Sequence, residues 1–348
     1  MKIAVGLSGG VDSAVAALLL KRAGHDVTGV TMKLWREGRY KGGCRDACFG
    51  PGESKDIALA GAFAKMAGIE HRVFDCADEY ERTVIEYFRR EKAAGRTPNP
   101  CVVCNALVKF GVLVEAATQS FGFDRFATGH YARIVSHGGR LAVAQACDCT
   151  KDQSYFLWRL SQEQLAKAMF PLGELNKKDV RRIAAEAALP MHDRPDSQDF
   201  YAGDCAELAG MAERPGDIVD TAGMTLGTHR GFWHYTVGQR KGIGVGGGTP
   251  LYVLRVDRTA NRIVVGPREE AVRTRFRIAG INWMGCEPAR RPVEGFIRIR
   301  SNDRAAVPAT LENGVVKAPD GVFGVAPGQS AVLYSTQGFI ICGGTIEE

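Results

Sequence analysis

Several features that would place the chain in a familiar class are missing from its sequence. No apolar run approaches the roughly 20 residues of a membrane helix, and the first residues lead straight into the apolar run 3–7 with no room for a signal peptide. We therefore expect a cytoplasmic protein with no membrane partner. Without an export signal, the ten cysteines predict reduced thiols rather than a disulfide framework.

Two common site motifs are also absent. The glycine-rich turn at residues 8–13 is not followed by Gly-Lys-Ser or Gly-Lys-Thr, which excludes a P-loop of the GxxxxGK[ST] type. Cys101 and Cys104 have CxxC spacing, which fits a zinc half-site, a redox pair, an iron–sulfur half-site or coincidence. A zinc site would need a second CxxC or an HxxxH, and the sequence offers only the looser pair Cys44 and Cys48.

What is present is typical of a globular protein. The chain of 348 residues is long enough for two or three domains, each with its own core. The formal net charge of +6 is mild, and it is compatible with an anionic partner such as RNA.

The first 130 residues alternate between strand and helix patterns. The apolar spacing predicts helices over 11–22, 54–67, 79–92 and 105–120, and strands over 27–32, 71–74 and 125–128. This alternation predicts an α/β fold with a doubly wound parallel sheet, which binds its ligand at the carboxyl ends of the strands. The loops at residues 8–13, 32–35 and 128–131 should then face one site.

The composition and the periodicity of the sequence change after about residue 205. A helical pattern over 162–189 gives way to dense glycine and short alternating strands, as in small β-sandwiches or barrels. We expect a first domain over residues 1–204, a small central β domain over 205–267 and a barrel-like C-terminal domain over 268–348.

The turn Ser8–Ser13 (SGGVDS) joins a short apolar strand to a predicted helix. Its glycines let backbone N–H groups approach phosphate oxygens, and a helix N-terminus favours negative charge. The pattern resembles the pyrophosphate loop of the ATP-pyrophosphatases, which pass an adenylyl group to a substrate oxygen. We expect ATP to contact Gly6, Leu7, Ser8, Gly9, Gly10, Val11, Asp12 and Ser13.

Asp12 and Cys104 are the two side chains in these motifs with the clearest chemistry. Mg²⁺ commonly takes one or two carboxylates plus phosphate oxygens, so Asp12 alone can position it; the plainer interpretation of Asp12 is a helix cap. Cys104 lies just before a predicted helix, and a cysteine at a helix N-terminus has a lowered pKa. We therefore expect Cys104 to be a nucleophile.

Seven short motifs, taken in order, resemble the bacterial tRNA-specific 2-thiouridylase family over essentially the whole chain. They are SGGVDS at 8–13, GRTPNPCVVCN at 95–105, ATGHYAR at 127–133, KDQSYFL at 151–157, FPLGEL at 170–175, HYTVGQRKGIG at 234–244 and PGQSA at 327–331. The resemblance implies that ATP adenylates O2 of the wobble uridine in tRNAs for Lys, Glu and Gln. A cysteine persulfide then delivers sulfur to C2, and AMP leaves.

The resemblance also implies roles for single residues. Cys104 matches the cysteine that carries sulfur, and Met32 and Gly129 match positions near the adenine and ribose. The residues expected at the tRNA are Asn99, Lys109, Lys151, Asp152 and Gln153, of which the last three lie close to the flipped-out uridine. The implied partner besides tRNA is a sulfur-donor protein, such as a cysteine desulfurase or a sulfur relay. We expect the protein to be a monomer.

The chain departs from the family at its second catalytic cysteine, where Tyr201 stands instead. In one interpretation Cys205 or Cys101 replaces it as the resolving thiol, while Cys104 carries a persulfide. In the other, Cys101, Cys104 and Cys205 hold a [4Fe–4S] cluster whose open iron binds sulfide, as in the iron–sulfur-dependent tRNA thiolases. Cys44 and Cys48 follow the second predicted strand and could join the site.

Basic residues near the end of the chain provide a further expectation. Arg298 and Arg300 are expected to contact the tRNA backbone, and such contacts position an RNA without reading its sequence. Two other functions remain open at this point. One is a small-molecule synthetase or amidotransferase with the same ATP loop, and the other is a non-catalytic tRNA-binding or sulfur-carrying protein.

Overall fold

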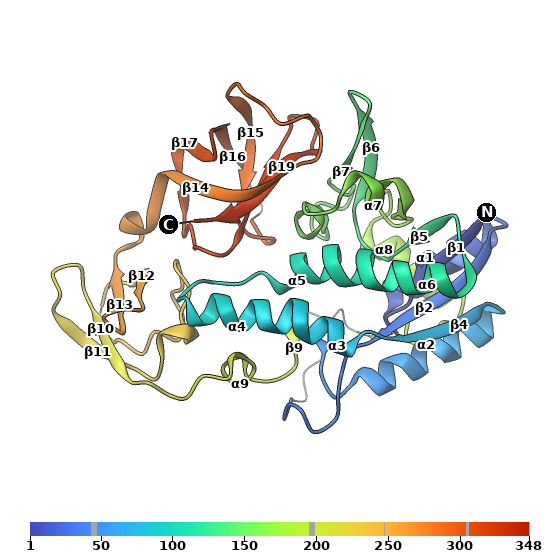
Figure 1. The fold of residues 1–348 in the computed structure, drawn as a ribbon, viewed down its shortest axis with the longest axis horizontal. Coiled ribbons are helices and arrows are strands. Elements are labelled where there is room, and N and C mark those ends of the chain that lie inside the picture. The colour runs from blue at the N-terminus through green and yellow to red at the C-terminus, as the bar shows by residue number, and fades with distance from the viewer. Residues whose placement is uncertain (43–46, 195–198, 247, 304–305, 348) are drawn as a thin grey trace.

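A computed structural model describes residues 1–42, 47–194, 199–246, 248–303 and 306–347. Its strands form a five-stranded sheet, a four-stranded sheet, a closed six-stranded barrel and two short pairs. In Figure 1 the barrel lies above the long central helices, and the two open sheets lie at opposite ends of the molecule. The predicted α/β domain followed by two small β domains is confirmed, whereas the limits 1–204, 205–267 and 268–348 remain a prediction.

The five-stranded sheet is parallel throughout and has the strand order β4-β2-β1-β5-β8. These strands are β1 (Lys2–Gly6), β2 (Asp26–Lys33), β4 (Glu70–Asp75), β5 (Arg125–Ala127) and β8 (Ala168–Met169). The chain leaves β1 toward β2 and β4, and it later returns on the other side with β5 and β8. The topological switch point therefore lies between β1 and β5, where open α/β sheets bind their ligands.

Successive residues of β1 face opposite helical layers. Ile3 and Val5 share a buried cluster with residues of α1 (Val11–Arg22), α2 (Glu53–Ala67) and α8 (Lys177–Glu186). Ala4 belongs to a second cluster, together with residues of the helix over 100–121. Because successive side chains of a strand point to opposite faces, helices cover both faces of the sheet as expected.

The helix over 100–121 is the central element of the first domain. It is continuous through α5 (Pro100–Val103), the π-helical segment η2 (Cys104–Val112) and α6 (Leu113–Phe121), and it starts earlier than the expected residue 105. By length and composition it could cross a membrane, which corrects the expectation that no segment qualifies. Val108 and Phe110 are nevertheless buried among other core residues, so the helix is packed as the core helix of a domain.

The other elements that precede the four-stranded sheet are short. They are α3 (Ala77–Tyr80), η1 (Glu81–Ile85), α4 (Glu86–Ala93), η3 (Ser154–Leu157), α7 (Gln162–Lys167), α9 (Cys205–Ala209), the hairpin β6 (Arg133–His137) with β7 (Arg140–Ala144), and the parallel pair β3 (Ala47–Phe49) with β9 (Asp199–Tyr201). Helix α2 starts at Glu53, one residue before the expected start, and follows Gly52 without a side-chain cap.

The remaining strands build the two small β domains. The four-stranded sheet contains β10 (Gly216–Val219), β11 (Thr225–His229), β12 (Tyr252–Asp257) and β13 (Arg262–Gly266), with η4 (Phe232–His234) and η5 (Arg268–Ala271) beside it. The closed barrel contains β14 (Val272–Trp283), β15 (Val293–Arg298), β16 (Val307–Glu312), β17 (Val315–Phe323), β18 (Ser330–Tyr334) and β19 (Ile340–Ile346).

Candidate active site

The turn Ser8–Ser13 lies at the carboxyl end of β1 and leads into α1. The Ser8 backbone N–H donates to Ser13 Oγ at 3.2 Å, and Ser13 Oγ donates to the Gly10 carbonyl at 3.1 Å. Gly9 has φ +73°, and an added Cβ would lie 2.5 Å from the Asp56 carbonyl of α2, so only glycine fits there. The turn is therefore held in shape by its own hydroxyls and by α2. The preceding Leu7 is buried against the core.

The segment after β5 packs directly on this turn. A Cβ added at Gly129 would lie 2.7 Å from the backbone of Asp12 and Ser13. Two residues further on, the Tyr131 hydroxyl donates to Asp12 Oδ1 at 2.9 Å. Met32, near the end of β2, is half-buried. The loops after β1 and β5 thus meet at the switch point, as the sequence predicts.

Lys177 is a member of this group that the sequence analysis missed. Its ammonium, on the first residue of α8, donates to both carboxylate oxygens of Asp12 at 2.7 and 2.8 Å. The Lys177 side chain is 10% exposed and that of Asp12 is 28% exposed, so this is a partly buried ion pair across 165 residues of sequence. Its only signal in the sequence is a lysine at the start of a helix soon after the motif at 170–175.

The pairing with Lys177 bears on the predicted magnesium ligand. Both oxygens of Asp12 already accept hydrogen bonds from Lys177, and one also accepts from Tyr131. The Asp12 side chain is nevertheless 28% exposed, and a carboxylate oxygen has more than one lone pair, so magnesium binding at Asp12 stays a prediction. In this structure Asp12 holds the Lys177 ammonium beside the phosphate turn.

Cys101 and Cys104 lie on one helix, on its first and second turns, and both are half-buried. Burial raises the pKa of the Cys104 thiol to about 11 and that of Cys101 to about 12, although the Lys109 ammonium lowers both. The expectation of a lowered pKa at Cys104 is therefore wrong. The helix begins at Pro100, so Cys104 is inside it rather than at its N-terminus, and loss of water outweighs the helix dipole.

Lys109 links the thiols to the phosphate turn. It lies five residues beyond Cys104 in the same π-helical segment, half-buried, and its charge also reaches His130. Burial and the Lys109 charge both lower the pKa of His130, whose ring bonds Thr128 Oγ1 at 2.7 Å. Lys109 therefore acts electrostatically both on the thiols and on His130, the neighbour of Gly129, which packs on the phosphate turn.

Tyr201 does not present its side chain to this site. It is buried in an aromatic cluster with Phe49 and Tyr40, and its hydroxyl donates to Glu207 at 3.0 Å. The preceding residues 195–198, including Ser197 and Gln198, and Cys44 lie outside the described residues. Cys205 is exposed at the start of α9, within electrostatic reach of Lys92.

The predicted three-cysteine iron–sulfur site is not assembled in this structure. Across the ranges that the structure describes, no three Cys, His, Asp or Glu side chains lie close enough together to hold a metal ion. Cys205 belongs to α9, which packs against α4, whereas Cys101 and Cys104 lie on the central helix. The ligand set Cys101, Cys104 and Cys205 therefore does not fit a cluster here.

Two residues expected at the tRNA form a buried ion pair instead. The Arg298 guanidinium in β15 lies 2.6 Å from the Asp152 carboxylate, and their side chains are 7% and 2% exposed. Asp152 also accepts from the Ala146 and Ser154 backbone N–H groups. Neither side chain can reach an RNA on the surface, so both predictions are corrected to a role in fastening the barrel to the first domain.

Arg300 and Asn99 also hold domains together. Arg300 donates to the Val237 and Gly324 carbonyls, which joins the barrel to the central β domain. Asn99 is buried, and its amide lies 3.4 Å from Ser330 Oγ of β18. The burial of Asn99 corrects its predicted tRNA contact, whereas Arg300 is half-buried and its tRNA contact stays a prediction. Lys151 and Gln153 are half-buried, and Gln153 accepts from the Tyr131 backbone N–H at 3.0 Å.

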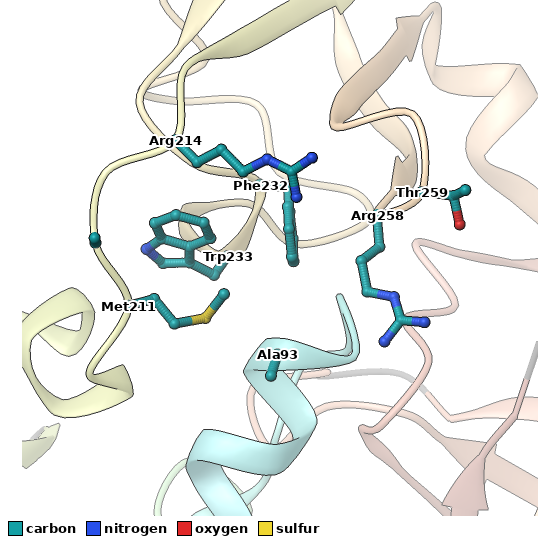
Figure 2. Close-up of a pocket in the computed structure, with 8 residues that line it drawn as sticks. Ala93, Met211, Arg214, Phe232, Trp233, Arg258 and Thr259 are labelled. Atoms are coloured by element: carbon teal, nitrogen blue, oxygen red, sulfur yellow. The ribbon is translucent and has the colours of Figure 1, made fainter.

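A pocket of about 550 Å³ lies away from these groups, where the end of α4 meets the central β domain. Figure 2 shows Phe232, Trp233 and Arg214 facing Ala93 at the end of α4, with Arg258 on another side. None of the residues predicted for the active site lines it. It is therefore separate from the phosphate turn and the thiols.

Comparison with family models covers nearly the whole chain. Residues 1–201 match the model described as the tRNA methyl transferase HUP domain. Residues 209–267 match the tRNA methyl transferase PRC-barrel domain, and residues 273–346 match the aminomethyltransferase beta-barrel domain. The three matches follow the order of the three parts of the fold.

Individual relatives are similar over their full length. A protein of Endomicrobium trichonymphae named tRNA-specific 2-thiouridylase MnmA is 41% identical, over 99% of each chain. A protein of the same name from Methylobacterium radiotolerans is 44% identical, over 99% of this chain and 93% of its own. Among solved structures, an NMN synthetase from Francisella tularensis has 22% identity and a TM-score of 0.35, covering 56% of this chain and 66% of its own.

Proposed function

Because the chain belongs to the tRNA-specific 2-thiouridylase family and is an enzyme of tRNA thiolation, we propose the following reaction for it. The wobble uridine O2 attacks the α-phosphorus of ATP, and pyrophosphate leaves. Sulfur carried by Cys104 then bonds to C2, and the C2–O2 bond breaks as AMP departs with the oxygen. The substrates are the tRNAs for Lys, Glu and Gln, and a sulfur-donor protein loads Cys104.

The phosphate turn supports the ATP half of this proposal. Backbone N–H groups at the start of α1 and the hydroxyls of Ser8 and Ser13 suit a pyrophosphate group. Lys177 adds a positive charge that Asp12 holds at the same place. Met32 and Gly129 would lie near the adenine and ribose. Adenylation makes chemical sense because it converts the uridine oxygen into a good leaving group.

The observation that carries the proposal is the position of Lys109. Its charge acts on the thiols of Cys101 and Cys104 and also on His130, which follows the residue packed on the phosphate turn. A cation there would stabilise a sulfur anion on Cys104 close to where ATP is bound. One site can therefore serve both activation and sulfur transfer.

No step of the proposal passes through a metal cluster, because Cys101, Cys104 and Cys205 are not brought together in the described residues. We propose that Asp12 would help to hold Mg²⁺ together with the phosphate oxygens of ATP. Anaerobic purification followed by iron analysis and an ultraviolet–visible spectrum tests this choice. Thiolation by colourless, iron-free enzyme is the expected result, and activity that depends on iron would overturn it.

We further propose an oligomeric state and a location for the enzyme. It works as a monomer in the cytoplasm, where its tRNA substrate is made. A single peak of monomer mass in gel filtration with light scattering is expected. A dimer that persists on dilution would contradict the monomer.

The decisive assay combines ATP, Mg²⁺, sodium sulfide or a persulfide donor, and unmodified tRNA. Digestion and mass spectrometry should reveal 2-thiouridine, with AMP formed in step with it and none without ATP. AMP formation on a small acid or amide donor without tRNA would favour the synthetase alternative. Binding of tRNA without any product would favour a carrier protein.

A further inference from the structure

Tyr131 connects the phosphate turn to the segment 151–155. It is buried in the loop after β5, and its hydroxyl donates to Asp12 Oδ1 at 2.9 Å. The Lys177 ammonium pairs with the same carboxylate and lies 5.6 Å from the centre of the Tyr131 ring, within the range of a cation–π interaction. The Tyr131 side chain therefore interacts with both charges of the ion pair beside the phosphate turn.

The backbone of Tyr131 is hydrogen-bonded to Gln153 in both directions. The Tyr131 N–H donates to Gln153 Oε1 at 3.0 Å, and the Gln153 N–H donates to the Tyr131 carbonyl at 2.8 Å. Two bonds fix the orientation of the segment as well as its distance, because each opposes rotation about the other. Gln153 is half-buried and belongs, with Lys151, to the residues expected near the flipped-out uridine. Tyr131 thus connects the residues expected at one substrate with the turn expected at the other.

The segment 151–155 is also anchored to the barrel. The Asp152 carboxylate lies 2.6 Å from the Arg298 guanidinium, and the Tyr155 hydroxyl donates to the Ser330 carbonyl at 2.9 Å. All four of these residues are buried. Weakening the link through Tyr131 therefore leaves the segment fastened to the barrel, and what changes is its alignment with the phosphate turn.

Adenylation depends on exactly this kind of alignment. The uridine O2 has to reach the α-phosphorus from the side opposite the leaving pyrophosphate, with the reacting atoms about 3–3.5 Å apart before the bond forms. In the proposed reaction the phosphate turn positions ATP, and a segment from a distant part of the chain positions the uridine. A misplacement of about 1 Å between two reactants can lower a rate about 10²-fold.

We propose that Tyr131 is a positioning residue for adenylation, which aligns the uridine with ATP by tying Gln153 to Asp12; this rests on the proposed function. The Tyr131 hydroxyl fixes the Asp12 carboxylate at the phosphate turn, and the Tyr131 backbone fixes the segment 151–155. The two substrates therefore keep one relative position during the attack of O2 on the α-phosphorus. Loading of Cys104 with sulfur does not involve this link.

The first test compares Tyr131→Phe with Tyr235→Phe. Y131F keeps the ring and both backbone bonds to Gln153 and removes only the bond to Asp12. Y235F removes another buried tyrosine hydroxyl, which donates to the Ile243 carbonyl in the central β domain. Enzyme is mixed with saturating ATP, Mg²⁺ and unmodified tRNA without a sulfur source, so that pyrophosphate release in a single turnover reports adenylation alone.

Y131F should release pyrophosphate about 10- to 100-fold more slowly, as expected for the loss of a hydrogen bond to a charged group. Y235F should match the wild type. The Kd values of Y131F for ATP, by calorimetry, and for tRNA, by filter binding, should stay within about twofold of the wild type. A merely structural role would lower the melting temperature of Y131F and leave the rate at 25 °C unchanged, and that result would overturn the proposal.

Gln153→Ala tests the same link from its other end and does not depend on the folding of Y131F. Q153A removes the acceptor of the Tyr131 N–H and should also slow pyrophosphate release. The double variant should lose clearly less than the product of the two single losses, because both changes act on one connection. A loss equal to the product, or wild-type speed of Q153A, would overturn the role of Tyr131 and leave the proposed function intact. Absence of both pyrophosphate release and 2-thiouridine from the wild type would instead reject the proposed function.

Discussion

The phosphate turn and the thiol site are built in opposite ways. The turn is six consecutive residues, polar, and organised around charge, with Asp12 paired to Lys177 at 2.7 Å. The thiols lie on the central helix, where Cys104 packs against an aromatic cluster, and Cys104 is a neutral thiol with a pKa of about 11. The phosphate turn is arranged to bind an anion before the reaction starts. The thiol site is neutral at rest, and it carries a negative charge only when a sulfur anion forms during the reaction.

The largest expected effect separates these two halves. Cys104→Ser should lower 2-thiouridine formation by at least about 10³-fold, because the nucleophile that carries sulfur is lost. Binding of ATP to the turn should be unchanged, as measured by calorimetry. A variant that still thiolates from a persulfide donor would break the division of labour between the two regions.

The Asp152–Arg298 pair tests whether the barrel is only a support for both regions. Arg298→Met should lower the free energy of unfolding by about 3–5 kcal/mol, because it leaves a buried carboxylate without its cation. Chemical denaturation measures this, with the exposed Arg290→Met as the control. If Arg298→Met kept wild-type stability and bound tRNA with a reduced salt dependence, Arg298 would instead contact tRNA, as predicted from the sequence.

Lys177→Met should weaken the use of ATP at the phosphate turn and leave the reactivity of the thiols unchanged. We expect kcat/KM for ATP to fall about 10- to 100-fold, since the cation beside the phosphates is lost and Asp12 is left unpaired. Persulfide loading of Cys104, read by intact-protein mass, should stay at the wild-type level. Equal losses in both measurements would show that the two regions are not separable.

Lys109→Gln should produce the smallest change, and it concerns the thiols. The thiolate is the reactive form, so alkylation of Cys104 by iodoacetamide should rise about tenfold per pH unit from 7 to 10 and level off only near the pKa of about 11. Removing the Lys109 charge raises the pKa further and should slow alkylation at pH 8 by about two- to tenfold. Peptide mapping assigns the label to Cys104, and an unshifted profile would exclude the cation from the thiol site.

The contrast between the regions also explains what could be predicted from the sequence. Ser8–Ser13 is a local motif, and the strand and helix on either side of it are regular, so its place at the end of β1 follows from the pattern. The burial of Tyr201 could not be predicted, because it depends on the pairing of two three-residue strands, β3 and β9, that lie far apart in the chain. The state of Cys104 was mispredicted because burial is a tertiary property.

The burial of charged side chains also could not be predicted from the sequence. Arg298 was predicted on the surface because buried charges are rare, but its partner Asp152 lies 146 residues earlier in the chain. Asn99 likewise faces the barrel because residue 328 packs against the backbone of Thr97, where only glycine leaves room. Motifs shared by the family therefore mark domain contacts as well as the site.

The most direct test of the account follows a single sulfur atom. Wild-type enzyme is loaded at Cys104 with ³⁴S persulfide, freed of donor, and mixed with ATP, Mg²⁺ and unmodified tRNA. The account predicts ³⁴S-labelled 2-thiouridine, at no more than one per enzyme, together with an equal amount of AMP. Label that stays on the protein while AMP accumulates, or 2-thiouridine formed without ATP, would contradict it.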